Sequence, residues 1–507
     1  MKVLLLNLFI FLSLQTVAQI VNQTESYQAE QMGYQRNSRE FTALKKNFRD
    51  SIQPKSLIYW NKKGYELSLN PAFDLQMGLK SNNDPFLYRT GIGTKIRAKK
   101  GKWNLGFSYL RQNAEYMDYQ TDFIENNSVV PSMNVADGNG QFSSDFVRGF
   151  LNFKTAGIFD FELGYGRNFI GDGYRSLLIS DHGKSYPYLK TSAKFWNVQY
   201  TSMISIHQDI FQVEGNSDLH RKKYIATHYL DWKVADWFSL GLFESIVWQD
   251  EEENFQRGFD VNYLNPVIYF RPVEFSVGSS DNALVGTNLK FTLSKNHHLY
   301  FQLVFDEFLL DEIRADVRQK LNPDDSIRSG WWGNKYAVQF GYKGFEMFGV
   351  EGLRTQVELN IVRPFTYTHS SSTQSFSNFN LPLAHPLGAN FEELVTKVDY
   401  FKQKWSFHFQ WNYSRQGQSE DGSNYGENLQ ISNTSRIRDF ENEIGQGNLN
   451  EVHFLSLKAK YLIKKEWNTF ISLGIISRHA QDDFQQLDEQ MISISISSNL
   501  FNQYFDF

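Results

Sequence analysis

Residues 353–361 read Leu-Arg-Thr-Gln-Val-Glu-Leu-Asn-Ile, an alternation of apolar and polar side chains that decides the fold. Successive side chains point to opposite faces of a β-strand, so one face here carries Leu, Thr, Val, Leu and Ile, and the other carries Arg, Gln, Glu and Asn. Residues 405–413 (WSFHFQWNY) repeat the pattern with aromatic residues, and residues 88–97 repeat it with Arg and Lys on the polar face. Each of these stretches indicates a strand with one apolar and one charged face.

Comparable stretches recur along most of the chain and predict about 18 strands. We expect them near residues 65–78, 87–98, 102–117, 146–154, 158–168, 188–194, 196–206, 223–233, 236–248, 286–294, 297–306, 333–342, 351–363, 391–401, 403–414, 451–463, 466–479 and 488–499.

The connections between these strands alternate between short and long. Short ones include Lys99-Lys100-Gly101 and Lys464-Lys465, and the long ones are 118–145, 169–187, 207–222, 249–285, 307–332, 364–390 and 415–450. Outer-membrane barrels have short turns at one end, long loops at the other and an even number of strands. The even number requires a tight turn at Phe195-Trp196. The sequence therefore predicts an all-β fold, a closed transmembrane antiparallel β-barrel of about 18 strands over residues 61–507.

The N-terminus has the pattern of an export signal. Met1-Lys2 precedes the apolar run 3–14, and a small-residue cleavage site ends at Ala18. We therefore expect a signal peptide over 1–18. Residues 19–60 are polar, with apolar residues at helical spacing, and predict a short periplasmic helical segment; a disordered leader is the alternative.

Composition narrows the classes of function. The chain of 507 residues has a net charge of −5, 16% aromatic residues and no cysteine. It shows no basic stripe that would bind nucleic acid, and it cannot form a disulfide or a thiolate metal site. Its 11 histidines show no metal-ligand spacing, and G-x-S-x-G is absent. We therefore expect a protein without catalytic activity, metal or cofactor.

Residues 165–190 (YGRNFIGDGYRSLLISDHGKSYPYLK) form the most distinctive loop. Gly183-Lys184-Ser185 is not a phosphate-binding loop, because Leu178 stands where that motif needs glycine and no helix follows. We expect this loop to fold into the lumen, since charges are costly on the lipid face. The candidate ligand-binding or lumenal residues are Arg167, Asp172, Tyr174, Arg175, Asp181 and Tyr186. The alternative is an Arg–Asp network that only stiffens the barrel.

Other charged groups occupy similar positions at strand ends. Paired carboxylates here would suit a hydrolase, but a polar barrel lumen has the same residues. The candidates are Glu244, Arg271, Glu274, Asp281, Asn282, Asp306 and Glu307, whereas we expect His385 to be a structural hydrogen-bonding residue. The final Phe507, after an alternating strand, is typical of a barrel-assembly signal.

Several blocks carry a resemblance to a known family. "GRNFIGDGYRSLLISD" with "YPYLK", then "GLFESIVW", "YLNPVIYFRPVEF", "SSDNALVGTNLKF" and "HLYFQLVFDEF", resemble the Wzi family of capsule-assembly outer-membrane proteins. "YTHSSS" and "LAHPLGANFEE" look more like its branch in Bacteroidetes, the gliding-motility proteins of the RemB type. The resemblance spans about residue 65 to the end. It implies a closed barrel of about 18 strands that binds surface polysaccharide without catalysis.

Two functions follow as expectations. The first is a non-enzymatic barrel of the cell outer membrane that binds or organises surface polysaccharide, in contact with outer-membrane lipid. The second is an accessory component of gliding motility that acts as a scaffold for gliding or secretion machinery. An outer-membrane hydrolase or an open porin fits less well, because long charged loops favour a plugged lumen. The loop around 421–443 departs from the capsule proteins and leaves the sugar open.

Overall fold

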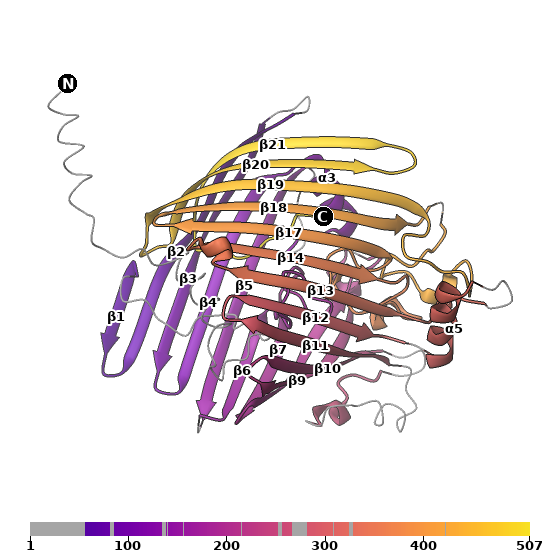
Figure 1. Cartoon of the computed structure of the whole chain (residues 1–507). Coiled ribbons are helices and arrows are strands. Elements are labelled where there is room, and N and C mark those ends of the chain that lie inside the picture. Colours follow the sequence, from indigo (N-terminus) through magenta and orange to yellow (C-terminus); the bar gives the residue numbers. More distant parts are fainter. Residues whose placement is uncertain are drawn as a thin grey trace.

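The computed structural model describes residues 56–507 except 82–85, 134–137, 139, 156, 214, 252–255, 266–280, 308, 324–327 and 421. The predicted signal peptide with Ala18, and almost all of the predicted helical segment, lie outside these residues. The described chain forms one large barrel with two short helices (Figure 1). Neither helix has the length and hydropathy that a membrane span requires.

Eighteen antiparallel strands close the barrel, as the alternating pattern predicted. Each strand pairs with the next along the chain, and the last pairs with the first from Phe73 opposite Ser498 to Lys80 opposite Met491. The strands are β2 (Tyr65–Lys80), β3 (Phe86–Lys100), β4 (Trp103–Glu115), β5 (Gln141–Thr155), β6 (Phe159–Gly166), β7 (Tyr186–Phe195), β8 (Val198–Asp209), β9 (Arg221–Ala235), β10 (Phe238–Gln249), β11 (Asn282–Ser294), β12 (His297–Phe305), β13 (Tyr336–Phe345), β14 (Leu353–Val362), β17 (Phe391–Lys402), β18 (Trp405–Gln418), β19 (Asn448–Lys464), β20 (Thr469–Gln481) and β21 (Gln486–Ser498).

Three further short strands lie outside this ring. β1 (Ile58–Lys62) pairs with the start of β2, beyond the part of β2 that β21 reaches. β15 (Ser377–Asn378) and β16 (Leu381–Pro382) pair with each other in the loop between β14 and β17. The helices are α3 (Asp118–Asn127) and α5 (Leu310–Leu321), both in long loops.

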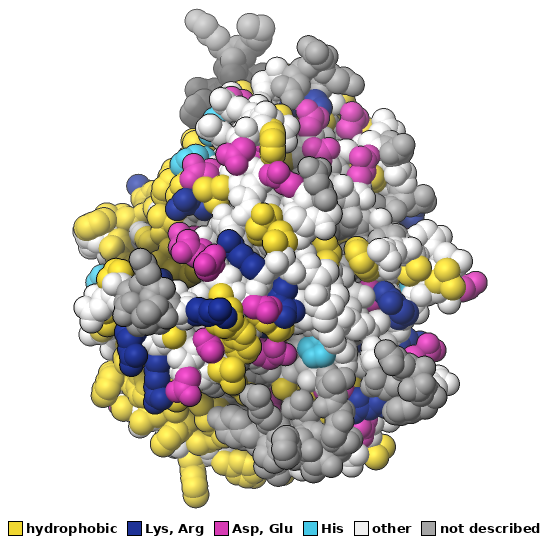
Figure 2. Space-filling model, turned by 90° about the vertical axis from the view of Figure 1, so that its right-hand side faces the viewer, with side chains coloured by type: hydrophobic (Ala, Val, Ile, Leu, Met, Phe, Trp, Pro, Cys, Tyr) yellow, Lys and Arg dark blue, Asp and Glu magenta, His cyan; other side chains and the backbone are white. Residues whose placement is uncertain are grey.

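All long loops lie at one end of the barrel, which also has the short turn Asp482–Gln485 between β20 and β21, whereas the other end has only short connections. The split at Phe195-Trp196 is confirmed: β7 and β8 meet in a two-residue turn, where Trp196 has a φ of +48°. Figure 2 views the long-loop end, where charged and other polar side chains cover most of the visible surface and hydrophobic ones gather toward one margin. We call the two ends the long-loop end and the short-turn end.

The alternation of the sequence assigns the two faces of the wall. On β14, Leu359 is 40% exposed on the outside, whereas its neighbours Glu358 and Asn360 are fully buried in the lumen. On β21, Ile492 and Ile494 are exposed, whereas Ser493 between them is buried. The outer face is therefore apolar and the inner face polar, as in barrels that span a lipid bilayer.

Candidate functional site

The loop between β6 and β7, residues 167–185, folds into the lumen; we call it the inward loop. Its apolar residues Leu177 and Leu178 are fully buried, in one cluster with Tyr229 and Phe243 of the wall. Within the loop, Ile170 and Ile179 form an isolated antiparallel bridge. Burial of these side chains removes apolar surface from water and holds the loop inside the barrel.

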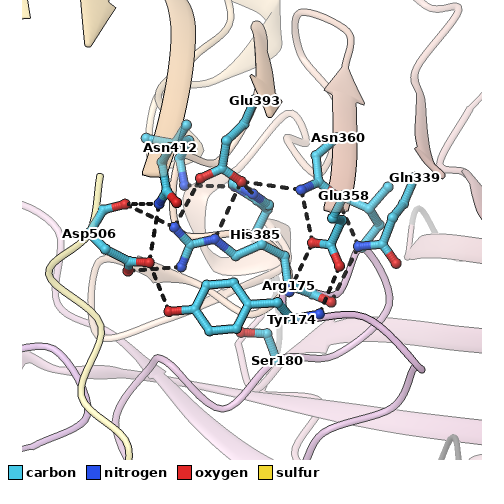
Figure 3. A network of polar contacts seen from close by, with 12 residues as sticks. Tyr174, Arg175, Ser180, Gln339, Glu358, Asn360, His385, Glu393, Asn412 and Asp506 are labelled. Carbon is cyan, nitrogen blue, oxygen red and sulfur yellow. Dashed lines mark hydrogen bonds and ion pairs between the residues drawn. The ribbon is translucent and has the colours of Figure 1, made fainter. Parts of the chain in front are cut away.

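Glycine is required where the inward loop meets the wall. A Cβ atom on Gly173 would lie 2.5 Å from Oε2 of Glu358, which is a severe overlap. This close approach lets the Glu358 carboxylate accept the backbone N–H groups of Tyr174 (2.7 Å) and Arg175 (3.0 Å) (Figure 3). Charge-assisted hydrogen bonds of this kind are stronger than neutral ones and fix the loop at mid-barrel.

Arg175 is the centre of the polar network. Its Nη2 lies 2.9 Å from Oε1 of Glu393 on β17, and its Nη1 lies 3.1 Å from Oδ1 of Asp506. Burial alone would lower the pKa of Arg175, but the carboxylates of Asp506 and Glu393 raise it well above its usual value. The guanidinium therefore stays charged and joins the inward loop to the wall and to the last residues of the chain.

His385 supports the same network, as expected of a structural hydrogen-bonding residue. The Leu387 N–H group donates to its Nδ1 (3.2 Å), so the proton resides on Nε2, which donates to Glu393 Oε2 (2.7 Å). Burial lowers the pKa of His385 although Glu393 opposes the shift, which agrees with a neutral imidazole.

The chain does not end on its last strand. β21 stops at Ser498, and residues 499–507, here called the lumenal segment, turn back into the barrel. The segment starts at the short-turn end, where Asn499 Nδ2 donates to the carbonyl groups of Pro71 (2.7 Å) and Trp467 (3.0 Å). It extends to α3, where the ring of Phe507 lies 4.5 Å from that of Phe123.

Each part of the lumenal segment has partners in the lumen. Phe501 stacks on Phe146 with ring centroids 3.5 Å apart, and Tyr504 Oη donates to Asp181 Oδ1 (2.7 Å). Asp506 accepts hydrogen bonds from Tyr174 Oη (2.8 Å) and from the amide side chains of Gln410 and Asn412. Phe507 therefore lies beside α3 and not on the last strand, which ends at Ser498, and its role as a barrel-assembly signal stays a prediction.

The remaining predicted residues of the inward loop also face polar partners. Asp172 accepts from Asn288 Nδ2 (2.9 Å), and Arg167 donates to the backbone carbonyl groups of Asp181 and Asn502. The Tyr186 hydroxyl accepts the N–H group of Asn168 (3.3 Å). Arg167, Arg175 and Asp181 thus all contact the lumenal segment, whereas Asp172 and Tyr186 bind the wall and the loop itself.

The residues predicted at other strand ends do not join this network. Asp306 accepts the N–H group of Tyr367 (2.8 Å), and burial raises its pKa to about 7. Glu307 pairs with Lys335 (3.2 Å), and Asn282 donates to the Gln374 carbonyl (3.0 Å). Asp281 binds Arg257 and the hydroxyl of Tyr263 in the loop after β10.

Glu244 lies on the opposite face from the lumen. Its neighbours on β10, Phe243 and Val247, pack against the inward loop, so the alternation turns Glu244 to the outside of the wall. It is buried there, directly opposite His228 of β9 in the strand register. Arg271 and Glu274 lie outside the described residues.

A concave pocket of about 420 Å³ opens at the long-loop end beside α3; we call it the long-loop pocket. The end of the lumenal segment contributes Phe507 to its wall, and α3 contributes Tyr119 and Phe123. The remaining wall is rich in side-chain amides: Asn126, Asn127, Asn380, Gln416, Gln418, Asn428, Gln430, Asn450, Gln481 and Gln485. A pocket with many amides and a few aromatic rings offers both hydrogen bonds and apolar faces to a ligand.

Gln430 has unused hydrogen-bonding capacity at this pocket. It is 6% exposed, and neither atom of its side-chain amide has a hydrogen-bond partner among the described residues. An unpaired buried amide costs free energy, on the order of 1–3 kcal/mol. The pocket also contains three carboxylates, and two are already bound: Glu427 accepts from Ser419, and Asp482 accepts the N–H groups of Phe484 and Gln485.

No protein-family model and no curated protein sequence matches the chain. Among solved structures, it is similar to Wzi of Escherichia coli, described as an outer-membrane protein involved in group 1 capsule assembly and a carbohydrate-binding β-barrel. The TM-score is 0.51 at 12% identity, over 86% of this chain and 85% of that one. This likeness shows the shared barrel fold. OprD of Pseudomonas aeruginosa follows with a TM-score of 0.42, 10% identity and coverage of 86% and 96%.

Sequence reasoning missed most partners of the inward loop. Glu358, Gln339 and Glu393 bind it, and of these only Glu358 stands on the polar face of a strand singled out by its alternation. Nothing in the local sequence pointed to the long-loop pocket, because its lining comes from α3, from several loops and from the ends of β18, β19, β20 and β21. The described residues contain no cluster of three or more histidine, aspartate or glutamate side chains suited to a metal ion.

Proposed function

We propose that this protein is a non-enzymatic barrel of the outer membrane that binds surface polysaccharide at the long-loop pocket. The observation that carries this proposal is the lining of the pocket, in which ten amide side chains surround the rings of Tyr119, Phe123 and Phe507. Amides both donate to and accept from sugar hydroxyls, and aromatic rings cover the apolar faces of sugars. The barrel shared with a carbohydrate-binding protein supports the proposal.

The outer face of the barrel supports a position in the outer membrane. Exposed aromatic side chains gather at the short-turn end: Trp60, Trp103, Phe159, Phe195, Trp196, Trp237, Phe348 and Trp405. Girdles of aromatic residues mark the lipid interfaces of outer-membrane barrels, whose short turns face the periplasm. This arrangement supports the proposal that the long loops, and with them the long-loop pocket, face the cell surface.

Cysteine labelling tests that orientation, because the natural chain has no cysteine. Ile437 is 53% exposed in the loop between β18 and β19. We expect Ile437→Cys to react with a membrane-impermeant maleimide on intact cells, and Lys464→Cys, at the short-turn end, to react only after the outer membrane is permeabilised. Reversed labelling would show that the barrel is inverted, and labelling of neither in intact or permeabilised cells would refute a surface barrel.

Removing an aromatic face of the pocket should weaken polysaccharide binding. We expect Phe123→Ala to raise the dissociation constant for the cell's own extracted surface polysaccharide about tenfold, equivalent to about 1.4 kcal/mol. The measurement is biolayer interferometry with the purified full-length barrel. Phe484 is the matched control, because it is 74% exposed at the same end and does not line the pocket. Equal binding by Phe123→Ala, Phe484→Ala and the natural protein would refute the proposed site.

The role in gliding motility stays a prediction from the sequence resemblance. No described feature of the barrel favours gliding or secretion machinery as a partner over a surface polysaccharide.

A further inference from the structure

A second cavity lies inside the barrel, between the lumenal segment and the wall formed by β2 and β18–β21. It has a volume of about 460 Å³, and we call it the lumen crevice. At one end its lining reaches Asn468 and Asn499, next to the short turns. At the other end it meets a buried apolar cluster that contains Met117 and Phe454. The lining of the crevice shares only Tyr119 with that of the long-loop pocket.

Two lysines of β19 point into the crevice without a close anionic partner. Neither Lys458 Nζ nor Lys460 Nζ makes an ion pair or a hydrogen bond with a described residue. Lys458 is solvent-exposed although it lies inside the wall, so water reaches this part of the lumen. Positive charge without a close partner along such a crevice attracts anions.

The carboxylates near these lysines are already engaged. Asp74 lies 2.5 Å from Arg89 Nε, and Asp506 is bound by Arg175. Asp399, beyond the lining, accepts from Arg354 Nε (3.0 Å). Glu115, the remaining carboxylate of the lining, is the last residue of β4, at the long-loop end.

The wall beside the lysines consists of small hydroxyl-bearing residues. They are Ser456, Ser472, Ser493, Ser495 and Ser497, with Gly78 and Gly474 between them. A Cβ atom on Gly474 would lie 3.6 Å from Lys458 Cε and 3.1 Å from Ser493 Oγ, so glycine leaves room for the lysine stem. Serine hydroxyls both donate and accept, which suits a ligand that carries many hydroxyl groups.

We propose that the lumen crevice binds an acidic oligosaccharide, entering from the short-turn end. Lys458 and Lys460 are two positions apart on one strand, so their Cα atoms are about 7 Å apart, a spacing suited to successive carboxylated sugars. Their ammonium groups would pair with the carboxylates, while the serines hydrogen-bond to the sugar hydroxyls. A free inorganic anion would satisfy the lysines and leave the row of serines unused.

Calorimetric titration of the purified full-length barrel with tetragalacturonate tests this site. We expect the double variant Lys458→Gln/Lys460→Gln to raise the dissociation constant about tenfold or more. Lys402→Gln/Lys404→Gln is the matched control, because it removes the same charge at the same end from an exposed turn outside the crevice. We expect this control to stay within about twofold of the natural protein, and binding to weaken as salt rises.

Three results would overturn the assignment. The first is equal loss of affinity in both double variants, which would indicate non-specific attraction. The second is inorganic phosphate or neutral cellotetraose binding as tightly as tetragalacturonate. The third is loss of tetragalacturonate binding in Phe123→Ala with none in Lys458→Gln/Lys460→Gln, which would place the acidic sugar in the long-loop pocket and leave the proposed function intact.

Discussion

Deletion of residues 499–507 is expected to convert a closed barrel into one that conducts ions across a lipid bilayer. Barrels of 16–18 strands have a lumen wide enough for an aqueous channel unless something fills it. Here nine residues that span about 30 Å when extended run from the short-turn end to α3. Planar-bilayer recordings should show stepwise currents for the truncated protein and none for the natural one.

The deletion leaves the wall and the inward loop in place, which makes the experiment informative. The inward loop keeps Glu358 and Glu393 as partners when Asp506 is absent. Phe484→Ala, an exposed change at the long-loop end, should remain non-conducting. Folding of each variant is checked by its heat-dependent mobility in gels. A folded truncation without current would show that the inward loop alone seals the barrel.

Replacement of Arg175 by alanine is expected to destabilise the barrel by about 3–5 kcal/mol, because it leaves Glu393 and Asp506 as buried carboxylates without their cation. Arg175→Lys should recover part of this loss, since one ammonium cannot serve both carboxylates as a planar guanidinium does. The measurement is the temperature at which the folded band disappears in gels. Arg314→Ala breaks an exposed ion pair with Asp311 and should change little.

The ion pair between Arg175 and Asp506 also makes the stability of the barrel depend on pH, in a direction that the pKa of Asp506 determines. Burial alone would raise the pKa of Asp506, but the positive charge of Arg175 has the larger effect. The pKa of Asp506 is therefore below the usual value of an aspartate. The contribution of Asp506 to stability is therefore present above the pKa of an unfolded aspartate and is lost as the pH falls through the lower folded value. Asp506→Asn should remove this part of the acid sensitivity. An unchanged acid midpoint in that variant would contradict the assigned role.

The alternating pattern of side chains was sufficient to predict the barrel. Leu359 faces out and Glu358 and Asn360 face in, because successive side chains of a strand point to opposite faces. This alternation does not depend on which strands lie beside it. The alternation of short and long connections predicted which end of the barrel carries the long loops. The requirement for an even number of strands predicted the turn at Phe195-Trp196. The glycines and charges of the inward loop predicted that it folds into the lumen. The structure agrees, because Gly173 lies so close to the wall that a side chain would not fit there.

The functional surfaces were decided only by the tertiary structure. Arg175 and Asp506 are 331 positions apart, and no local signal relates them. The path of residues 499–507 depends on the width of the closed lumen and on partners from distant parts of the chain, such as Phe146, Asp181 and Arg478. The alternation before Phe507 could not show that the last strand ends at Ser498. The sequence by itself determined which face of most strands points outward, because alternation is a property of neighbouring residues; Glu244 of β10, a charged side chain on the outer face, is an exception. What fills the lumen follows from contacts between distant residues, and these exist only once the barrel has closed.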